Sequence, residues 1–226
     1  MRPPVFHRMY GYNLSLLPNK RLADLERGVT TLEEARKKSG MTIGYPGWGF
    51  IYHLLLSHLD RKREEILVET GSNVGCTTIV LAQALVDAGC KGRVMTFELE
   101  AKNVAAAREN YAAAGLADRI EIFEGDIHKT FAPNTANLAN VRFAFLDASH
   151  LINDVMFEFE TLLPRLAPDA LVLFDNTYRI AEEGEDPRVN GAMKRITKEF
   201  GGNLINLENV SWFTPGLAIW QREPAL

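Results

Sequence analysis

The chain has 226 residues, of which 46% are hydrophobic and 24% are charged, enough for one large α/β domain. Its net charge of −4 argues against a nucleic-acid partner, because phosphate binding needs a concentrated basic face. Its two cysteines form no disulfide framework, and no run of residues resembles a signal peptide or a membrane span, so we expect a cytoplasmic protein.

Residues 1–64 differ in pattern from the rest of the chain. "LADLERGVTTLEEARKKSG" (22–40) predicts helix with a weak apolar face. "MTIGYPGWGFIYHLLLSHL" (41–59) turns through glycines into a more apolar helix. We interpret residues 1–64 as a helical cover over a sheet built by residues 65–226, the two together forming one structural domain.

From residue 65 onward, short apolar strands alternate with amphipathic helices. The predicted strands are 65–71, 92–100, 119–126, 141–150, 170–176 and two more within 203–223. The predicted helices between them are 76–89, 103–115, one starting near residue 127, 151–166 and 191–202. This order predicts an α/β fold, a doubly wound, mostly parallel, Rossmann-like sheet of seven strands with helices on both faces.

Each of the first five strands ends on a carboxylate. These residues are Glu69, Glu98, Asp126, Asp147 and Asp175. Ligands of open parallel sheets bind outside the carboxyl ends of the strands, where the strand order reverses. The series of acids therefore indicates a site along this edge, although any single one could simply mark the point where a strand reaches solvent.

The first strand runs into a glycine turn, "VETGSNVG" (68–75). A dinucleotide fingerprint fails there because positions 73 and 76 are Asn and Cys, and a Walker-type loop fails for lack of Gly-Lys-Ser/Thr. What remains, acid-x-Gly-x-x-x-Gly, suits a cofactor with a nucleoside and an amino-acid end. The alternative is a turn that merely packs a helix against a strand.

Two further acids have competing interpretations. Glu98 lies about 20 residues beyond the glycine turn, where a ribose-binding acid is expected. Glu100 is its rival, but its position at a helix start is favoured by the helix dipole alone. Asp126 could accept the adenine amino group or cap the helix that starts near Ile127.

Taken in order, "VETGSNVGCTT", "VMTFELE", "IFEGD", "FAFLDASH" and "LVLFDN" resemble the class I S-adenosylmethionine-dependent methyltransferases. More narrowly, they resemble the cation-dependent O-methyltransferases of the catechol and caffeoyl-CoA type, over about residues 41 to 221. The resemblance implies S-adenosylmethionine as cofactor, Mg²⁺ or another divalent cation, a small hydroxylated acceptor and a possible homodimer.

The resemblance also implies a set of cofactor-binding residues. Those assigned to the cofactor are Met41, Thr42, Ile43, Glu69, Gly71, Ser72, Asn73, Gly75, Thr77, Glu98, Leu99, Asp126, Ile127 and Asp147. Among them, Glu69 and the two glycines would hold the methionine end, and residues 41–43 would close over the cofactor.

The implied metal ligands are Asp147, Asp175 and Asn176. Two carboxylates and an amide oxygen are hard ligands that suit Mg²⁺. A hydroxyl bound to the cation would lose its proton more readily. The alternative is that these residues only cap helices.

His150 departs from the catechol-type pattern, which has Lys three residues after the first metal-binding Asp. Asp-x-x-His is similar to methyltransferases that act on sugar or antibiotic hydroxyls. A histidine is a suitable general base near neutral pH. We therefore predict that His150 takes the acceptor proton, with a water-facing histidine at a helix start as the alternative.

Tyr45, Trp48 and Arg179 complete the predicted substrate contacts, because they lie in loops that would face the acceptor. The other histidines (His7, His53, His58 and His128) show no partner spacing, and we expect them on the surface or packed in helices. Three other functions stay open at this point: a metal-independent methyltransferase of oxygen or nitrogen, an NAD(P)-dependent oxidoreductase and a binding-only relative.

Overall fold

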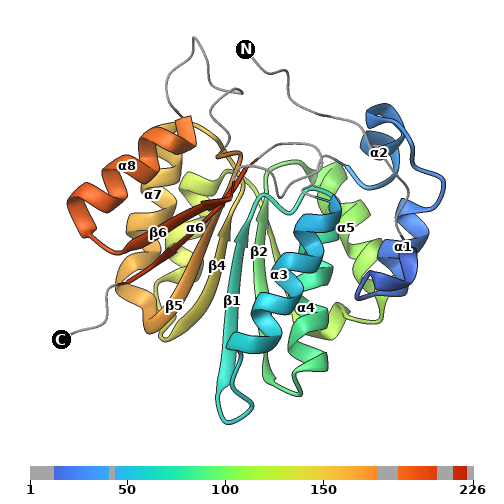
Figure 1. Ribbon diagram of the computed structural model, residues 1–226, viewed down its shortest axis with the longest axis horizontal. Helices are drawn as coiled ribbons and strands as arrows, with labels where there is room; N and C mark the ends of the chain where they lie inside the picture. The colour runs from blue at the N-terminus through green and yellow to red at the C-terminus, as the bar shows by residue number, and fades with distance from the viewer. Residues whose placement is uncertain (1–12, 41–43, 178–187, 208–215, 223–226) are drawn as a thin grey trace.

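A single sheet of seven strands forms the centre of the molecule (Figure 1). A computed structural model describes residues 13–40, 44–177, 188–207 and 216–222. The strands are β1 (Glu64–Thr70), β2 (Lys91–Glu98), β3 (Ile120–Glu124), β4 (Val141–Leu146), β5 (Leu166–Asp175), β6 (Asn203–Leu207) and β7 (Leu217–Gln221). The predicted fold class, a mostly parallel Rossmann-like sheet of seven strands, is confirmed.

The strands lie in the order β3-β2-β1-β4-β5-β7-β6. The first five are parallel, whereas β7 runs antiparallel to both β5 and β6. The chain lays β2 and β3 on one side of β1 and then crosses to place β4 on the other. The strand order thus reverses between β1 and β4, which is where a ligand site is expected in such a sheet.

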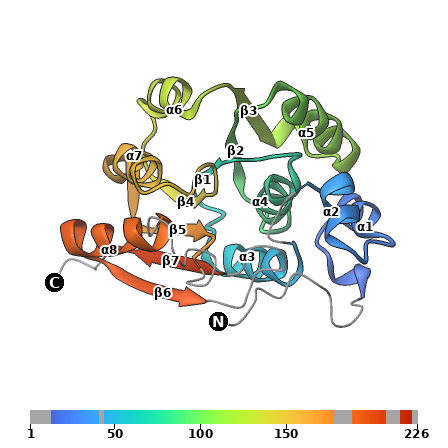
Figure 2. The same ribbon diagram turned by 90° about the horizontal axis from the view of Figure 1, so that it is seen from above.

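Helices cover both faces of the sheet (Figure 2). The α-helices are α1 (Lys20–Glu26), α2 (Leu32–Lys38), α3 (Gly44–His58), α4 (Cys76–Asp87), α5 (Ala101–Ala114), α6 (Ile127–Thr135), α7 (Ile152–Leu162) and α8 (Arg188–Phe200). The 3-10 helices are η1 (Leu14–Leu16), η2 (Ala117–Arg119) and η3 (Leu163–Arg165). Helices α3, α4 and α5 lie on one face, and α6, α7 and α8 on the other.

Strand β4 shows why the sheet is buried on both sides. All six of its residues are buried. Phe143 and Phe145 belong to the core under α3 and α4, and Ala144 and Leu146 to the core under α6 to α8. Successive side chains of a strand point to opposite faces, so the apolar run from Phe143 to Leu146 fills both layers.

Residues 22–40, predicted as one helical stretch, contain most of α1 and all of α2, which are two separate helices. Thr31 caps the start of α2 and forms a capping box with Glu34, so a second helix begins there. Leu22 and Leu25 of α1 and Ile51 of α3 are buried in the same core as β1 and β4. The division of the chain at residue 64 and the homodimer stay predictions.

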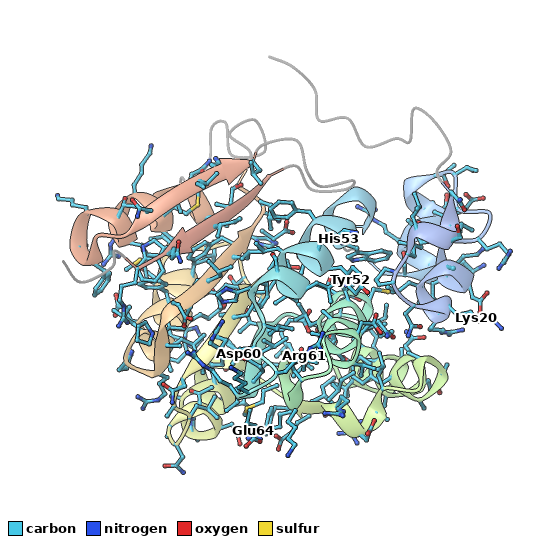
Figure 3. All side chains as sticks on the ribbon, turned by 60° about the horizontal axis from the view of Figure 1, so that its bottom comes forward. Lys20, Tyr52, His53, Asp60, Arg61 and Glu64 are labelled. Atoms are coloured by element: carbon cyan, nitrogen blue, oxygen red, sulfur yellow. The ribbon has the colours of Figure 1, made fainter. Side chains whose placement is uncertain are left out.

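Other differences from the predictions are small. Strand β5 begins at Leu166 rather than residue 170, and α8 begins at Arg188 rather than residue 191. The turn between α3 and β1, with Asp60 and Arg61, lies at the amino edge of the sheet, as does Glu64, the first residue of β1 (Figure 3). Among the described residues, no helix combines the length and apolarity needed to cross a membrane.

Candidate active site

A cleft of about 710 Å³ opens at the carboxyl ends of β1 to β5. It spans the point where the strand order reverses. The predicted site residues that line it are Gly71, Asn73, Glu98, Leu99, Asp126, Ile127, Asp147, His150, Asp175 and Asn176. The fold therefore brings the ends of all five parallel strands to one cavity.

The glycine turn after β1 is tightly packed. A Cβ at Gly71 would lie 2.2 Å from the backbone oxygen of Asp147, and one at Gly75 would lie 2.3 Å from a ring carbon of Tyr111. Both glycines also have positive φ, 77° and 87°. Packing alone thus accounts for both glycines, and of the two only Gly71 lines the cleft.

Glu98 at the end of β2 is held by three donors. Its carboxylate accepts hydrogen bonds from the backbone N–H of Asn73 (2.7 Å), from that of Glu100 (3.0 Å) and from the Asn103 amide (3.1 Å). The rival acid, Glu100, is exposed and makes no capping hydrogen bond with its side chain. Glu98 is therefore the better fixed of the two carboxylates at the cleft.

Glu69 lies in the interior and is 1% exposed. Its carboxylate accepts hydrogen bonds from the hydroxyls of Thr78 and, at 2.6 Å, Thr96. Burial raises the pKa of Glu69 to about 7. This carboxylate ties α4 to β1 and β2, which argues against the predicted contact with the methionine end of a cofactor.

Three more predicted residues are buried away from the cleft lining. Ser72 is 4% and Thr77 6% exposed, and Trp48 is fully buried in the core, where its indole N–H donates to the Thr77 hydroxyl at 3.3 Å. Trp48 therefore packs α3 against α4, and its predicted role in lining the acceptor pocket is corrected. Met41, Thr42, Ile43, Arg179 and the side chain of Tyr45 lie outside the described residues.

Asp147, Asp175 and Asn176 all line the cleft, at the ends of the neighbouring strands β4 and β5. The backbone N–H of Asp147 donates to Thr70, at 3.1 Å to its hydroxyl and 3.2 Å to its carbonyl. Burial, and then the Asp175 carboxyl beside it, raises the pKa of Asp147 well above its usual range. Within the described chain, the buried amide oxygen of Asn176 accepts no hydrogen bond.

Asp126 caps α6, as one of its two interpretations predicted. Its carboxylate accepts a hydrogen bond from the backbone N–H of His128 at 3.0 Å. The side chain is still partly exposed and lines the cleft, so capping does not exclude contact with a ligand. His150, three residues after Asp147, is half-buried and lines the same cavity.

Known proteins resemble the chain in both sequence and fold. A family model described as a methyltransferase domain matches residues 68–177. A catechol O-methyltransferase of Mycobacterium tuberculosis is 31% identical over 160 residues, which cover 68% of this chain and 67% of that protein. A catechol O-methyltransferase of Niastella koreensis is 30% identical over 165 residues, or 70% of each. The chain belongs to the class I S-adenosylmethionine-dependent O-methyltransferases.

Solved O-methyltransferases share the fold over nearly the whole chain. One from Bacillus cereus, in complex with SAH, has a TM-score of 0.72 over 91% of each chain at 24% identity. TomG from Streptomyces achromogenes, involved in tomaymycin synthesis and in complex with SAM, has a TM-score of 0.73 over 90% of each chain at 19% identity. Membership of this family removes the NAD(P)-dependent oxidoreductase from the open functions.

The cleft of this O-methyltransferase contains a polar cluster that the sequence did not indicate. Asp154 accepts a hydrogen bond from the Ser149 hydroxyl at 2.6 Å and lies 2.9 Å from Nε2 of His128. All three residues line the cleft, and His128 is an exposed residue of a helix, as the sequence predicted. Since Ser149 donates to the carboxylate and not to the imidazole, the cluster is not a nucleophilic triad.

Sequence reasoning had one usable signal for this cluster. His128 and Ser149 each follow a strand that ends at the same edge of the sheet, as do the predicted residues Asp126 and Asp147. Asp154 gives no such signal, because an acid in the first turn of a helix is expected from the helix dipole alone.

Proposed function

We propose that this O-methyltransferase methylates a hydroxyl of a small molecule with the help of a divalent cation, Mg²⁺ in the first instance. His150 serves as the general base, and Asp147, Asp175 and Asn176 hold the cation. The proposal rests on the carboxyl groups of Asp147 and Asp175 and the amide oxygen of Asn176, which all lie at one cleft. The Asn176 oxygen accepts no hydrogen bond within the described chain.

The donor set fits Mg²⁺. A buried amide oxygen that accepts no hydrogen bond from the described residues is costly unless a ligand satisfies it. Two adjacent carboxyl groups repel each other when both are ionised, and a divalent cation would relieve that repulsion. Among the described residues, no group of three or more His, Cys, Asp and Glu could hold a metal ion, and the proposed set has only two such residues.

The cofactor half of the cleft offers groups for the nucleoside end of S-adenosylmethionine. Glu98 would accept hydrogen bonds from the ribose hydroxyls with the lone pairs that its three donors leave. Leu99 is 63% exposed beside it and, with Ile127, would pack against the adenine. Asp126 would accept the adenine amino group.

The acceptor half would position a hydroxyl and remove its proton. S-adenosylmethionine supplies an electrophilic methyl group, and Mg²⁺ would lower the pKa of the acceptor hydroxyl. His150 would take the proton of that hydroxyl as its oxygen bonds to the methyl carbon, and the bond from that carbon to sulfur would break to release S-adenosylhomocysteine. The cleft walls hold the two reactants in line, which removes much of the entropic barrier to a bimolecular step.

Catechols are the first acceptors to screen, because both relatives whose sequences are compared above are named catechol O-methyltransferases. Phenols, sugars and natural products with free hydroxyls would be screened next. Sugars and natural products are included because this chain has Asp-x-x-His in place of Asp-x-x-Lys.

One observation supports a second candidate, a metal-independent methyltransferase of oxygen or nitrogen. Burial and the neighbouring Asp175 carboxyl raise the pKa of Asp147 well above its usual range, which favours a proton shared by the two carboxyl groups. Such a shared proton could relieve their repulsion in place of a cation, leaving Asp147 and His150 to act alone.

A Mn²⁺ titration followed by electron paramagnetic resonance separates the two candidates. The protein would be loaded with S-adenosylhomocysteine, so no acceptor is needed. We expect one saturable site, lost in Asp175→Ala and in Asn176→Ala. Asn134→Ala, which removes an exposed amide on α6, is the matched control and should bind Mn²⁺ like the wild type.

Binding that is absent from the wild type, or unchanged in both ligand variants, would contradict the cation site. The metal-independent candidate would then predict methyl transfer that persists in excess EDTA.

A further inference from the structure

Helix α1 is anchored to the sheet domain at its first turn. Lys20 marks its start on the outer side of the molecule (Figure 3), and Figure 2 shows α1 beside α5. The Asn19 amide donates to the Gln83 side chain on α4 (2.8 Å) and to the Ala114 carbonyl on α5 (3.2 Å). Because Asn19 also caps α1, the helix start is fixed to both α4 and α5.

Arg21 makes a second, more specific connection. Its guanidinium donates twice to the side-chain oxygen of Asn110 on α5, from Nε at 3.0 Å and from Nη2 at 2.8 Å. Asn110 is 5% exposed and uses its amide nitrogen to donate to the backbone carbonyl of Val74 at 2.7 Å. One buried amide thus joins the N-terminal cover to the glycine turn.

Val74 lies between two residues of that turn that have positive φ, Asn73 at 50° and Gly75 at 87°. A non-glycine residue in this conformation costs free energy and persists only where its surroundings hold it. On the cleft side, Glu98 accepts the Asn73 N–H at 2.7 Å. On the far side, Asn110 donates to the carbonyl of the peptide group between Val74 and Gly75.

We propose that Arg21 and Asn110 are positioning residues that set the shape of the cofactor-binding turn from outside the cleft. The proposal rests on the proposed function in one respect, that S-adenosylmethionine binds along Gly71, Asn73 and Glu98. It gives the N-terminal cover a role in cofactor affinity, although neither Arg21 nor Asn110 lines the described part of the cleft.

Linkage makes the proposal reciprocal. If docking of α1 favours the turn conformation that binds cofactor, then bound cofactor must favour docking of α1 by the same factor. Protection of α1 amides from hydrogen exchange should therefore rise when the wild type is saturated with S-adenosylhomocysteine, in a helix that the ligand does not touch.

Three variants separate turn positioning from simple stability. Asn110→Asp keeps an oxygen for Arg21 but replaces the donor to Val74 with an acceptor. Arg21→Ala removes the other end of the connection. Arg27→Ala is the matched control, since Arg27 lies at the end of α1 and, among the described residues, its side chain pairs only with Asp24, at 3.2 Å and with 69% of the Arg27 side chain exposed.

The measurements are the dissociation constant for S-adenosylhomocysteine by calorimetry and the melting temperature of the free protein. We expect Asn110→Asp and Arg21→Ala to weaken binding about fivefold to tenfold, and Arg27→Ala to change it by less than about twofold. Binding unchanged in Asn110→Asp and Arg21→Ala, with only their melting temperatures lowered, would overturn the proposal.

Two other outcomes are distinguishable from that one. A wild type that does not bind S-adenosylhomocysteine would overturn the placement of the cofactor and, with it, this inference. If a variant fails to fold, the wild-type exchange experiment decides: added protection in residues 20–26 supports the proposal, and none overturns it.

Discussion

The two edges of the sheet bury charged groups in opposite ways. At the amino edge, the Arg142 side chain is 5% exposed and lies among acids, 3.2 Å from Asp169 and 3.9 Å from Glu65. Arg142 also donates to the carbonyl of His58 at 2.6 Å. Each of these contacts joins the buried cation to an acceptor, as expected where charge serves only the fold.

At the carboxyl edge, acids lie near other acids. Burial raises the pKa of Glu69 to about 7 and that of Glu158 to about 8. Asp147 is affected by burial and then by Asp175, Glu69 and Glu158. Grouped carboxyl groups with raised pKa values are costly to the fold and typical of functional sites. Changes at the amino edge should therefore alter stability, and changes at the carboxyl edge should alter function.

Loss of the buried cation at the amino edge has the largest expected effect. Arg142→Met should lower the free energy of unfolding by about 3 to 5 kcal/mol, because Glu65 is left buried without its cation. Binding of S-adenosylhomocysteine by the folded protein should be unchanged. Urea denaturation and calorimetry measure the two quantities.

The control for Arg142 is Arg195→Ala. This arginine forms an exposed i,i+4 pair with Glu199 at 3.2 Å, so its loss should cost less than about 1 kcal/mol. Similar losses of stability in the two variants would show that the buried ion-pair network does not stabilise the fold.

At the carboxyl edge, His150→Ala should lower kcat by about a hundredfold or more, because it removes the proposed general base. Affinity for S-adenosylhomocysteine should stay unchanged. Rates would be measured with the phenolic or catecholic acceptor that a screen identifies. His53→Ala, an exposed histidine on α3, is the control. Equal losses of turnover and cofactor affinity would rule out a specific role as base.

Glu158 offers a smaller, pH-dependent effect. Burial raises its pKa from 4.5 to about 8, against the hydrogen bond from Thr70 at 2.6 Å, which lowers it. The folded protein holds this proton more tightly than the unfolded chain does. Its contribution to stability is therefore fully present below about pH 4.5 and is lost as the pH rises through about 8.

Glu158→Gln keeps an acceptor for Thr70 and removes the titration. Its free energy of unfolding should fall less than that of the wild type between about pH 6 and pH 9. Denaturation at several pH values measures this slope, with the exposed Glu160→Gln on the same helix as control. Parallel curves for wild type and Glu158→Gln would refute the assignment. Glu69, which shifts in the same direction, remains in both proteins.

The fold was predictable because periodicity and strand-end residues are local signals. The same rule brought Glu98, Asp126, Asp147 and Asp175 to one cleft, since parallel strands end at the same edge. It could not tell which way a strand-end side chain points, and Glu69 turns inward to Thr78 and Thr96.

Other errors arose where packing decides. "GYPGWG" looked like a loop, but Gly44 begins α3 and Trp48 packs into the core with a hydrogen bond to Thr77. Burial of a large aromatic side chain outweighs the poor helix propensity of glycine there. The contact of His128 with Asp154 joins two helix starts 26 residues apart, which no local pattern encodes.

Gly71 has a consequence for how the proposed reactants are spaced. Its missing side chain allows the turn after β1 to lie directly against the backbone of Asp147, where even one carbon atom would be 2.2 Å from the carbonyl oxygen. The proposed cofactor half and acceptor half of the cleft therefore meet through main chain. Rotamer changes cannot alter that contact, so the spacing of the two backbone segments that would hold the proposed reactants is set before either one binds.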